Sequence, residues 1–301
     1  MGRKIDIRGN VPALVTPFDD NGQIYYDDLE EIVRWHLSCG ADGICVAGDN
    51  GESWALSVEE RRKLAETVVR VVDGRVPVVF GASATTAAQS ILYADAVAST
   101  GVSALMIGPQ SYVMKATTSE IVARIEKIHR AVPLPVVLYN SPRRNGISLT
   151  LEDMRAITEA VDVCALKEAT RDFFYLSQVI HLFGERLSVM VGPAPYIIPG
   201  IYLGAAGFIS SGPELLGDRT AQVMAAAVQL PTKDIRDLQY AYTRIYEALM
   251  GLGTWPSSLK AALQLAGIPA GVPREPLAPL SRNDVSKLAE VMQEIGIPIR
   301  A

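Results

Sequence analysis

A lysine near the end of a short apolar segment is the residue of this sequence best suited to chemistry. Residues 163–170 read as a buried parallel strand, because the segment is apolar and a helix-like segment begins near Arg171. Alternation along a strand places Ala165 and Lys167 on one face. If this face lines a barrel, burial lowers the pKa of the Lys167 amine. The free amine can attack a carbonyl and form a Schiff base. The alternative is an ordinary strand-end lysine paired with Glu168.

A tyrosine in the preceding predicted strand is a candidate for proton transfer. Residues 135–139 read as a strand that neighbours the lysine strand, so Tyr139 and Lys167 point into the same interior if their alternation agrees. Formation and hydrolysis of a Schiff base need a group that moves protons, and a tyrosine hydroxyl within hydrogen-bond distance can do this. The alternative is a packing role for Tyr139.

Two loops offer groups that could hold a substrate. The segment Gly48-Asp49-Asn50-Gly51-Glu52 is bracketed by glycines, which suits it to bring backbone N–H groups close to a carboxylate, although it is also a plain turn. Arg143 and Arg144 follow Pro142, and an arginine at a barrel mouth can hold a carboxylate with two hydrogen bonds. Further polar or small residues are expected at the ends of strands: Thr16, Ser83, Gly192, Ser210 and Ser211.

The elements that would position these residues alternate regularly between strand and helix. Strands are predicted at 11–18, 43–47, 77–80, 104–107, 135–139, 163–170, 187–191 and 207–210, and helices at 26–39, 58–72, 87–99, 119–131, 196–203 and after Pro213. This alternation predicts an α/β fold, a (β/α)8 TIM barrel spanning residues 9–230. A doubly wound sheet is disfavoured because no GxGxxG follows the first strand. Helices at 233–250, 257–266 and 282–295 predict a C-terminal helical extension over residues 231–301.

Composition restricts the partners of the protein. The net charge is −5 and both signs are interspersed, so we expect neither nucleic acid nor an anionic membrane surface as a partner. The cysteines Cys39, Cys45 and Cys164 have no CxxC spacing, and no apolar run is long enough for a signal peptide or a bilayer span. We therefore expect a cytoplasmic protein. The three histidines fall in helical segments, and no phosphate-binding or nicotinamide motif is present, which predicts a mechanism without metal or cofactor.

Several motifs together resemble the dihydrodipicolinate synthase/N-acetylneuraminate lyase superfamily of class I aldolases. They are Thr16-Pro17-Phe18, Gly48-x-x-Gly51-Glu52, Leu138-Tyr139-Asn140-x-Pro142, Leu166-Lys167-Glu168-Ala169-Thr170, Gly207-x-Ile209-Ser210 and Pro273-Arg274-x-Pro276-Leu277-x-Pro279-Leu280. The resemblance covers about residues 9 to 297, in order. It implies a barrel with a C-terminal helical bundle, assembled as a homotetramer or dimer of dimers. It also implies a Schiff base between Lys167 and pyruvate or another 2-oxo acid, with Tyr139 transferring protons. Substrate contacts are expected from Asp49, Asn50, Arg144, Gly192, Ile209 and Thr16.

The sequence departs from the family pattern at the substrate side. Asp49 and Asn50 stand where the family commonly has hydroxylic residues, while Arg144 matches the arginine with which the synthases hold aspartate semialdehyde. Tyr112 matches the tyrosine that some members contribute across a subunit interface only with a shift of one position. Some synthases of this family have a pocket that binds lysine as an inhibitor. The corresponding segment here, with Trp54, Val58 and Arg61, matches that pocket poorly.

These departures bear on the substrate. An ionised Asp49 can only accept hydrogen bonds, so we expect loop N–H groups, with the Asn50 amide, to hold the keto-acid carboxylate. Asp49 would face a substrate hydroxyl or act as a base, or would simply cap its own turn. The main hypothesis is a Schiff-base lyase that acts on pyruvate or a related 2-oxo acid by aldol cleavage, condensation or dehydration. The substrate expected for it is a hydroxylated 2-keto-3-deoxy sugar acid. The alternatives are 4-hydroxy-tetrahydrodipicolinate synthase and a catalytically silent ligand-binding barrel.

Overall fold

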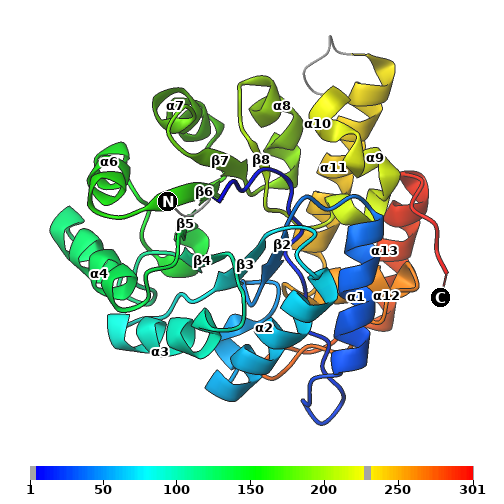
Figure 1. Ribbon diagram of the computed structural model, residues 1–301. Coiled ribbons are helices and arrows are strands. Elements are labelled where there is room, and N and C mark those ends of the chain that lie inside the picture. The colour runs from blue at the N-terminus through cyan, green and yellow to red at the C-terminus, as the bar shows by residue number, and fades with distance from the viewer. Residues whose placement is uncertain (1–4, 227–231, 301) are drawn as a thin grey trace.

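Eight parallel strands form one curled sheet, which helices surround (Figure 1). The computed structural model describes residues 5–226 and 232–300. The strands are hydrogen-bonded in the order β1-β8-β7-β6-β5-β4-β3-β2. Their bounds are β1 (Gly9–Asn10), β2 (Ile44–Val46), β3 (Val78–Gly81), β4 (Ala104–Ile107), β5 (Val136–Asn140), β6 (Val163–Glu168), β7 (Ser188–Val191) and β8 (Gly207–Phe208).

The segment after β1 connects the two edges of this sheet. The N–H of Leu14 donates to the carbonyl of Cys45 over 2.9 Å, and the N–H of Cys45 donates to the carbonyl of Pro12 over 2.9 Å. Eight parallel strands joined in this way are consistent with the predicted (β/α)8 barrel. The predicted first strand at 11–18 was wrong in its bounds, because Pro12 and Pro17 have no N–H to donate and interrupt the ladder.

The helices alternate with the strands along the chain. Around the sheet lie α1 (Tyr26–Ser38), η1 (Ser53–Ala55), α2 (Val58–Val72), α3 (Ala87–Ala98), α4 (Thr118–Ala131), α5 (Pro142–Asn145), α6 (Leu151–Ala160), α7 (Phe173–Phe183), η2 (Ala194–Tyr196), α8 (Ile197–Tyr202), η3 (Pro213–Leu216), α9 (Asp218–Ala221) and α10 (Val223–Ala226). The predicted capping box of α2 is present: Ser57 accepts from the N–H of Glu60, whose side chain accepts from the N–H of Ser57. Between β5 and β6 lie α5 and α6, neither of which was predicted from the sequence.

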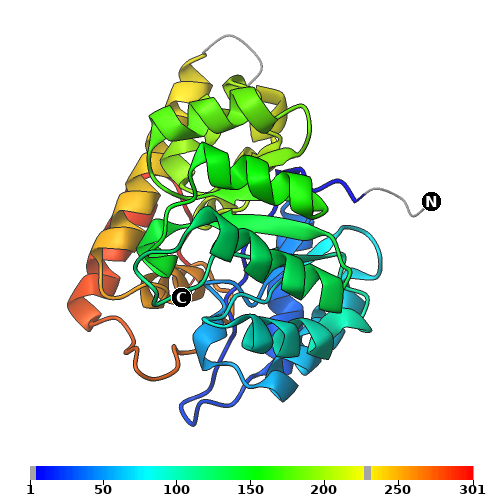
Figure 2. The same ribbon diagram turned by 90° about the vertical axis from the view of Figure 1, so that its left-hand side faces the viewer.

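Three helices follow the barrel: α11 (Lys233–Gly251), α12 (Ser257–Leu265) and α13 (Arg282–Glu294). They contact one another, and α11 also packs against η2. Figures 1 and 2 show them together along one side of the molecule. The predicted boundary at residues 230–231 lies outside the described residues. Within the described part of the chain, no helix is long and apolar enough to cross a membrane.

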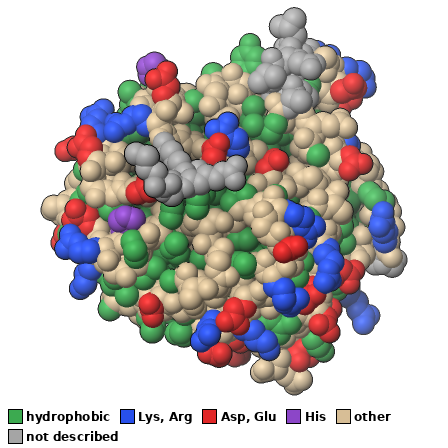
Figure 3. Space-filling view, viewed as in Figure 1, with side chains coloured by type: hydrophobic (Ala, Val, Ile, Leu, Met, Phe, Trp, Pro, Cys, Tyr) green, Lys and Arg blue, Asp and Glu red, His purple; other side chains and the backbone are tan. Residues whose placement is uncertain are grey.

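The strands separate two apolar cores. The larger core fills the layer between sheet and helices and contains Leu138 and Leu166. The smaller core fills the interior enclosed by the sheet and contains Val137, Tyr139 and Ala165. Because side chains alternate along a strand, Lys167 shares the face of Ala165 and points into this interior. On the surface seen in Figure 3, acidic and basic side chains are interspersed.

Candidate active site

A cavity of about 330 Å³ lies where several strands reach their carboxyl ends. This is the end of a parallel barrel at which active sites form. Seven of the eight site residues expected from the sequence line it: Asp49, Asn50, Tyr139, Arg144, Lys167, Gly192 and Ile209. The cavity therefore brings together side chains from β5, β6 and the loops after β2, β5, β7 and β8.

Lys167 is the buried amine of this cavity. It is 7% exposed, and burial lowers its pKa, an effect that the nearby Arg144 adds to and that Cys45 and Asp49 oppose. Residues Tyr139 and Lys167 are paired in the register of β5 and β6, and the Lys167 Nζ atom lies 4.8 Å from the centroid of the Tyr139 ring. The two strands thus place an amine with a lowered pKa beside a phenol.

Tyr139 keeps its proton at neutral pH. Burial raises the pKa of its hydroxyl, and the charge of Asp49 raises it further, while a hydrogen bond with Ser141 lowers it. A protonated phenol can donate to an oxygen that is leaving carbon and can take the proton back later. This matches the requirement of reversible Schiff-base chemistry.

Asp49 and Arg144 form an ion pair in the lining of the cavity. The Arg144 Nε atom lies 2.7 Å from Asp49 Oδ2, and the two side chains are 15% (Asp49) and 40% (Arg144) exposed. Burial raises the pKa of Asp49, and the charges of Arg144 and Lys167 oppose this rise. From the sequence the two residues were expected to act separately, and the structure pairs them.

The Asn50 amide anchors its own loop. Its Nδ2 atom donates to the carbonyl of Ala13 over 2.7 Å and to the Ser211 hydroxyl. Thr16 also anchors this loop, because its hydroxyl donates to the carbonyl of Gly51 over 2.8 Å. Thr16 does not line the cavity. In the part of the chain that the structure describes, the N–H groups of Asp49 and Asn50 have no acceptor, which leaves them for an anion.

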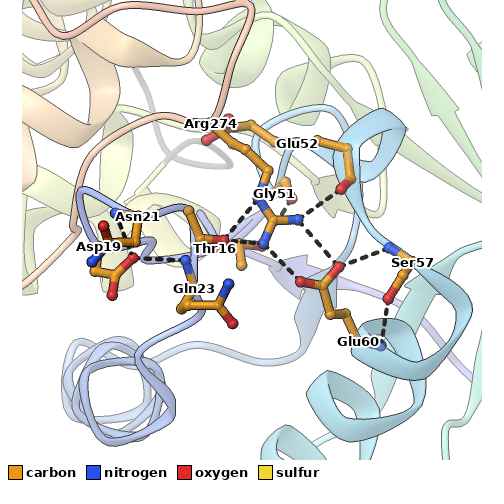
Figure 4. A network of polar contacts seen from close by, with 11 residues as sticks. Thr16, Asp19, Asn21, Gln23, Gly51, Glu52, Ser57, Glu60 and Arg274 are labelled. Atoms are coloured by element: carbon orange, nitrogen blue, oxygen red, sulfur yellow. Dashed lines mark hydrogen bonds and ion pairs between the residues drawn. The ribbon is translucent and has the colours of Figure 1, made fainter.

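A network of ion pairs and hydrogen bonds around Arg274 holds the end of the same loop (Figure 4). Glu52 has φ of +52° and is fully buried; its Oε1 atom is 2.6 Å from Lys260 Nζ of α12. The other carboxylate oxygen accepts from the N–H of Arg274 over 2.8 Å. The Arg274 guanidinium pairs with Glu60 of α2 at 2.7 Å and donates to the carbonyls of Gly22 and Ala55. The C-terminal residues thus fix the loop that carries Asp49.

The residues that follow β7 and β8 line another part of the cavity. A Cβ at Gly192 would come within 2.7 Å of the Glu168 carbonyl oxygen and of Ala169, so only glycine fits there. Ile209 is fully buried and supplies an apolar contact. Ser210 also lines the cavity, and its hydroxyl oxygen is buried and has no hydrogen-bond partner within residues 5–226 and 232–300.

Other lining residues were not identified from the sequence. Arg171 follows β6, whereas Tyr246, Met250 and Trp255 come from α11 and the loop after it. Nothing in the sequence pattern links α11 to the lysine strand, since an amphipathic helix shows no sign of what its apolar face covers. Tyr112 lies away from this cavity and is 91% exposed, with φ of +71°.

Fold and site together define a lyase of the class I aldolase type. The chain belongs to the Dihydrodipicolinate synthetase family, whose model matches residues 6–295. It is 31% identical to 4-hydroxy-tetrahydrodipicolinate synthase of Methanococcus aeolicus over 97% of this chain and 100% of that protein. It also resembles the structure of the chloride-inhibited dihydrodipicolinate synthase from Acinetobacter baumannii complexed with pyruvate, with 27% identity, a TM-score of 0.90 and coverage of 97% and 99% of the two chains. N-acetylneuraminate lyase from Fusobacterium nucleatum, at 23% identity, shares the fold with a TM-score of 0.86 over 96% of this chain and 98% of that chain.

Proposed function

We propose that the protein forms a Schiff base between Lys167 and pyruvate or a related 2-oxo acid. It then makes or breaks a bond at the carbon atom next to the former carbonyl carbon. The observation that carries this proposal is the buried Lys167 amine, with its lowered pKa, 4.8 Å from the ring of Tyr139. The solved relative that contains pyruvate supports the same class of substrate.

The residues present provide for each proton of this reaction. The neutral amine attacks the carbonyl carbon, and Tyr139 donates its proton to the carbonyl oxygen, which becomes a hydroxyl. The Tyr139 phenolate then takes a proton from the attacking nitrogen and donates it to this hydroxyl, which leaves as water and produces the iminium ion. The iminium withdraws electrons, so that a proton or an aldehyde fragment can leave from the neighbouring carbon. Tyr139 can then return protons during hydrolysis, which frees Lys167.

The substrate that the site favours is a hydroxylated 2-keto-3-deoxy acid. Asp49 lines the cavity and can accept a hydrogen bond from a substrate hydroxyl. The free N–H groups of Asp49 and Asn50 support binding of the keto-acid carboxylate by the loop. The Asn50 amide already donates to two protein oxygens, which argues against the carboxylate contact that was expected from it.

A second candidate is 4-hydroxy-tetrahydrodipicolinate synthase, which condenses pyruvate with aspartate semialdehyde. The activity of relatives that are 28–31% identical, named as this synthase, favours it. The Asp49–Arg144 ion pair disfavours it, because the arginine expected to hold the aldehyde's carboxylate already has an anionic partner. Assays with aspartate semialdehyde and with 2-keto-3-deoxy sugar acids separate the two candidates.

Reductive trapping tests the proposed chemistry directly. Pyruvate with borohydride should add an irreversible adduct, and peptide mapping should locate it on Lys167. The Lys167→Ala variant should not be labelled, whereas Lys233→Met, which removes an exposed lysine amine that does not line the cavity, should still be labelled at Lys167. An adduct that persists in Lys167→Ala would remove Lys167 as the Schiff-base residue.

We also propose that the protein acts in the cytoplasm as a homotetramer or dimer of dimers. The free thiols of Cys39, Cys45 and Cys164 suit a reducing compartment. Exposed apolar side chains, such as Tyr112 at 91% and Met114 at 81%, suit an interface between subunits. Sedimentation equilibrium measures the assembly, and a monomer at micromolar concentration would contradict it.

A further inference from the structure

The cavity contains a cation that the proposed chemistry does not use. Arg171 lies just beyond β6 and lines the same cavity as Lys167. Its φ is +65°, in the left-handed region that residues with a side chain seldom adopt. This backbone conformation sets the direction in which the arginine leaves the strand.

Two tyrosines hold Arg171 in this conformation. The hydroxyl of Tyr196 donates to the Arg171 carbonyl over 2.9 Å. The guanidinium carbon lies 5.0 Å from the centroid of the Tyr246 ring, on the cavity side of α11. A planar guanidinium supported by an aromatic ring keeps its hydrogen-bond donors available at the ring's edge.

The charge of Arg171 is not balanced by a neighbouring carboxylate. Within residues 5–226 and 232–300, no ion pair involves Arg171, whereas Arg144 is paired with Asp49. The adjacent Asp172 caps α7 by accepting from the N–H of Tyr175 over 3.1 Å. Glu168 accepts from Asn140 and from the N–H of Thr170. The nearest acidic side chains in sequence therefore have other partners.

We propose that Arg171 binds an anionic group at the end of the substrate remote from its 2-oxo group, so that the preferred substrate is a 2-oxo diacid. The assignment rests on the proposed function, because Lys167 fixes where the 2-oxo end lies. A guanidinium is suited to this role, since it can donate two parallel hydrogen bonds to a carboxylate. The proposal narrows the substrate class to hydroxylated 2-oxo acids with a second carboxylate.

Calorimetric titration tests the anion contact without requiring turnover. The probes are 2-oxoglutarate and 2-oxoadipate, each compared with the methyl ester of its distal carboxylate. The unmodified protein should bind at least one diacid about tenfold to a hundredfold more tightly than its ester, the range expected for a charged hydrogen bond. Arg171→Gln should abolish this preference, and Arg171→Lys, which keeps the charge, should retain part of it. Arg143→Gln removes one positive charge from the same cavity and should keep the preference.

Equal affinity of the unmodified protein for both diacids and their esters would overturn the proposal. So would a preference that survives Arg171→Gln, or one that Arg143→Gln reduces equally. If Arg171→Gln does not fold, Arg171→Lys decides the question. The role of Arg171 would be contradicted if Arg171→Lys kept the full preference for the diacid over its ester while Arg143→Gln lost that preference. Borohydride trapping of pyruvate is measured on the same proteins and should be unchanged in Arg171→Gln. Absence of trapping in the unmodified protein would contradict the Schiff base, while the titrations would still decide whether Arg171 binds an anion.

Discussion

The guanidinium of Arg144 and the carboxylate of Asp49 form an ion pair, with 2.7 Å between Nε and Oδ2. The pair joins the loop after β2 to the short helix α5. A substrate carboxylate that approached Arg144 would meet the negative charge of Asp49 beside it. The pair thus reduces the ability of Arg144 to bind a second anion and leaves Asp49 oriented as a hydrogen-bond acceptor.

Replacing Asp49 should therefore shift the substrate preference. Asp49→Ala should lower kcat/KM for a 2-keto-3-deoxy sugar acid by about tenfold to a hundredfold, because a charged hydrogen bond to a substrate hydroxyl is lost. Asp49→Ala and Asp49→Thr should both raise the affinity for aspartate semialdehyde, because Arg144 loses its partner. Robust synthase activity of the unmodified protein that Asp49→Ala leaves intact would contradict this assignment.

Tyr139→Phe should fold normally and lose most of its turnover. The change removes the hydroxyl but keeps the ring, so we expect a decrease of about 10²- to 10⁴-fold in kcat, the usual contribution of a general acid–base group. The matched control is Tyr175→Phe, since the Tyr175 hydroxyl donates to the carbonyl of Leu149 and does not line the cavity. A decrease below roughly tenfold for Tyr139→Phe would assign the residue to packing.

The stability gain from Lys167→Met should depend on pH. The pKa of Lys167 is lowered from 10.5 in the folded protein, so in the window between its folded pKa and 10.5 the unfolded chain binds the additional proton. The destabilisation by this lysine is therefore fully present below its folded pKa, and it disappears as the pH rises towards 10.5. Urea denaturation of both proteins from about pH 7 to about pH 9.5 should show the advantage of Lys167→Met shrinking. An advantage independent of pH would indicate that Lys167 keeps an ordinary pKa.

Lys260→Met should destabilise the protein strongly. It leaves the fully buried carboxylate of Glu52 without its ionic partner, a change that typically costs about 3–5 kcal/mol. The double variant Glu52→Gln/Lys260→Met should lose less than the sum of the two single variants, because no buried charge is left uncompensated. Lys233→Met provides the surface control, since its pair with Asp237 is exposed and should contribute within about 1 kcal/mol. Equal urea midpoints for Lys260→Met and Lys233→Met would contradict the role of the buried pair.

Much of the fold could be predicted from local signals. Seven of the eight strands, α2 with its capping box, and the pairing of Tyr139 with Lys167 follow from short apolar runs, cap residues and alternation along neighbouring strands. The first strand could not be placed correctly, because the apolar run at 11–18 suggests a strand while Pro12 and Pro17 interrupt its ladder.

The site was less predictable where partners are distant in sequence. Nothing local shows that Asn50 anchors its loop through Ala13 and Ser211, or that Asp49 pairs with Arg144. Arg171 carried one available signal: an arginine just after the lysine strand, at the predicted barrel mouth. Its support by Tyr246 of α11 required the three-dimensional arrangement.

The contact between Glu52 and Arg274 spans 222 residues and has a consequence for biosynthesis. A chain emerging from the ribosome exposes its N-terminal part first. Every strand of the barrel is thus available before Lys260 and Arg274 have left the exit tunnel, yet the loop carrying Asp49 still lacks both cations. A nascent chain in this state holds Lys167 before the Asp49 loop has its contacts with α12 and Arg274. The cavity around Lys167 is complete only after the chain through Arg274 has emerged and packed against the barrel.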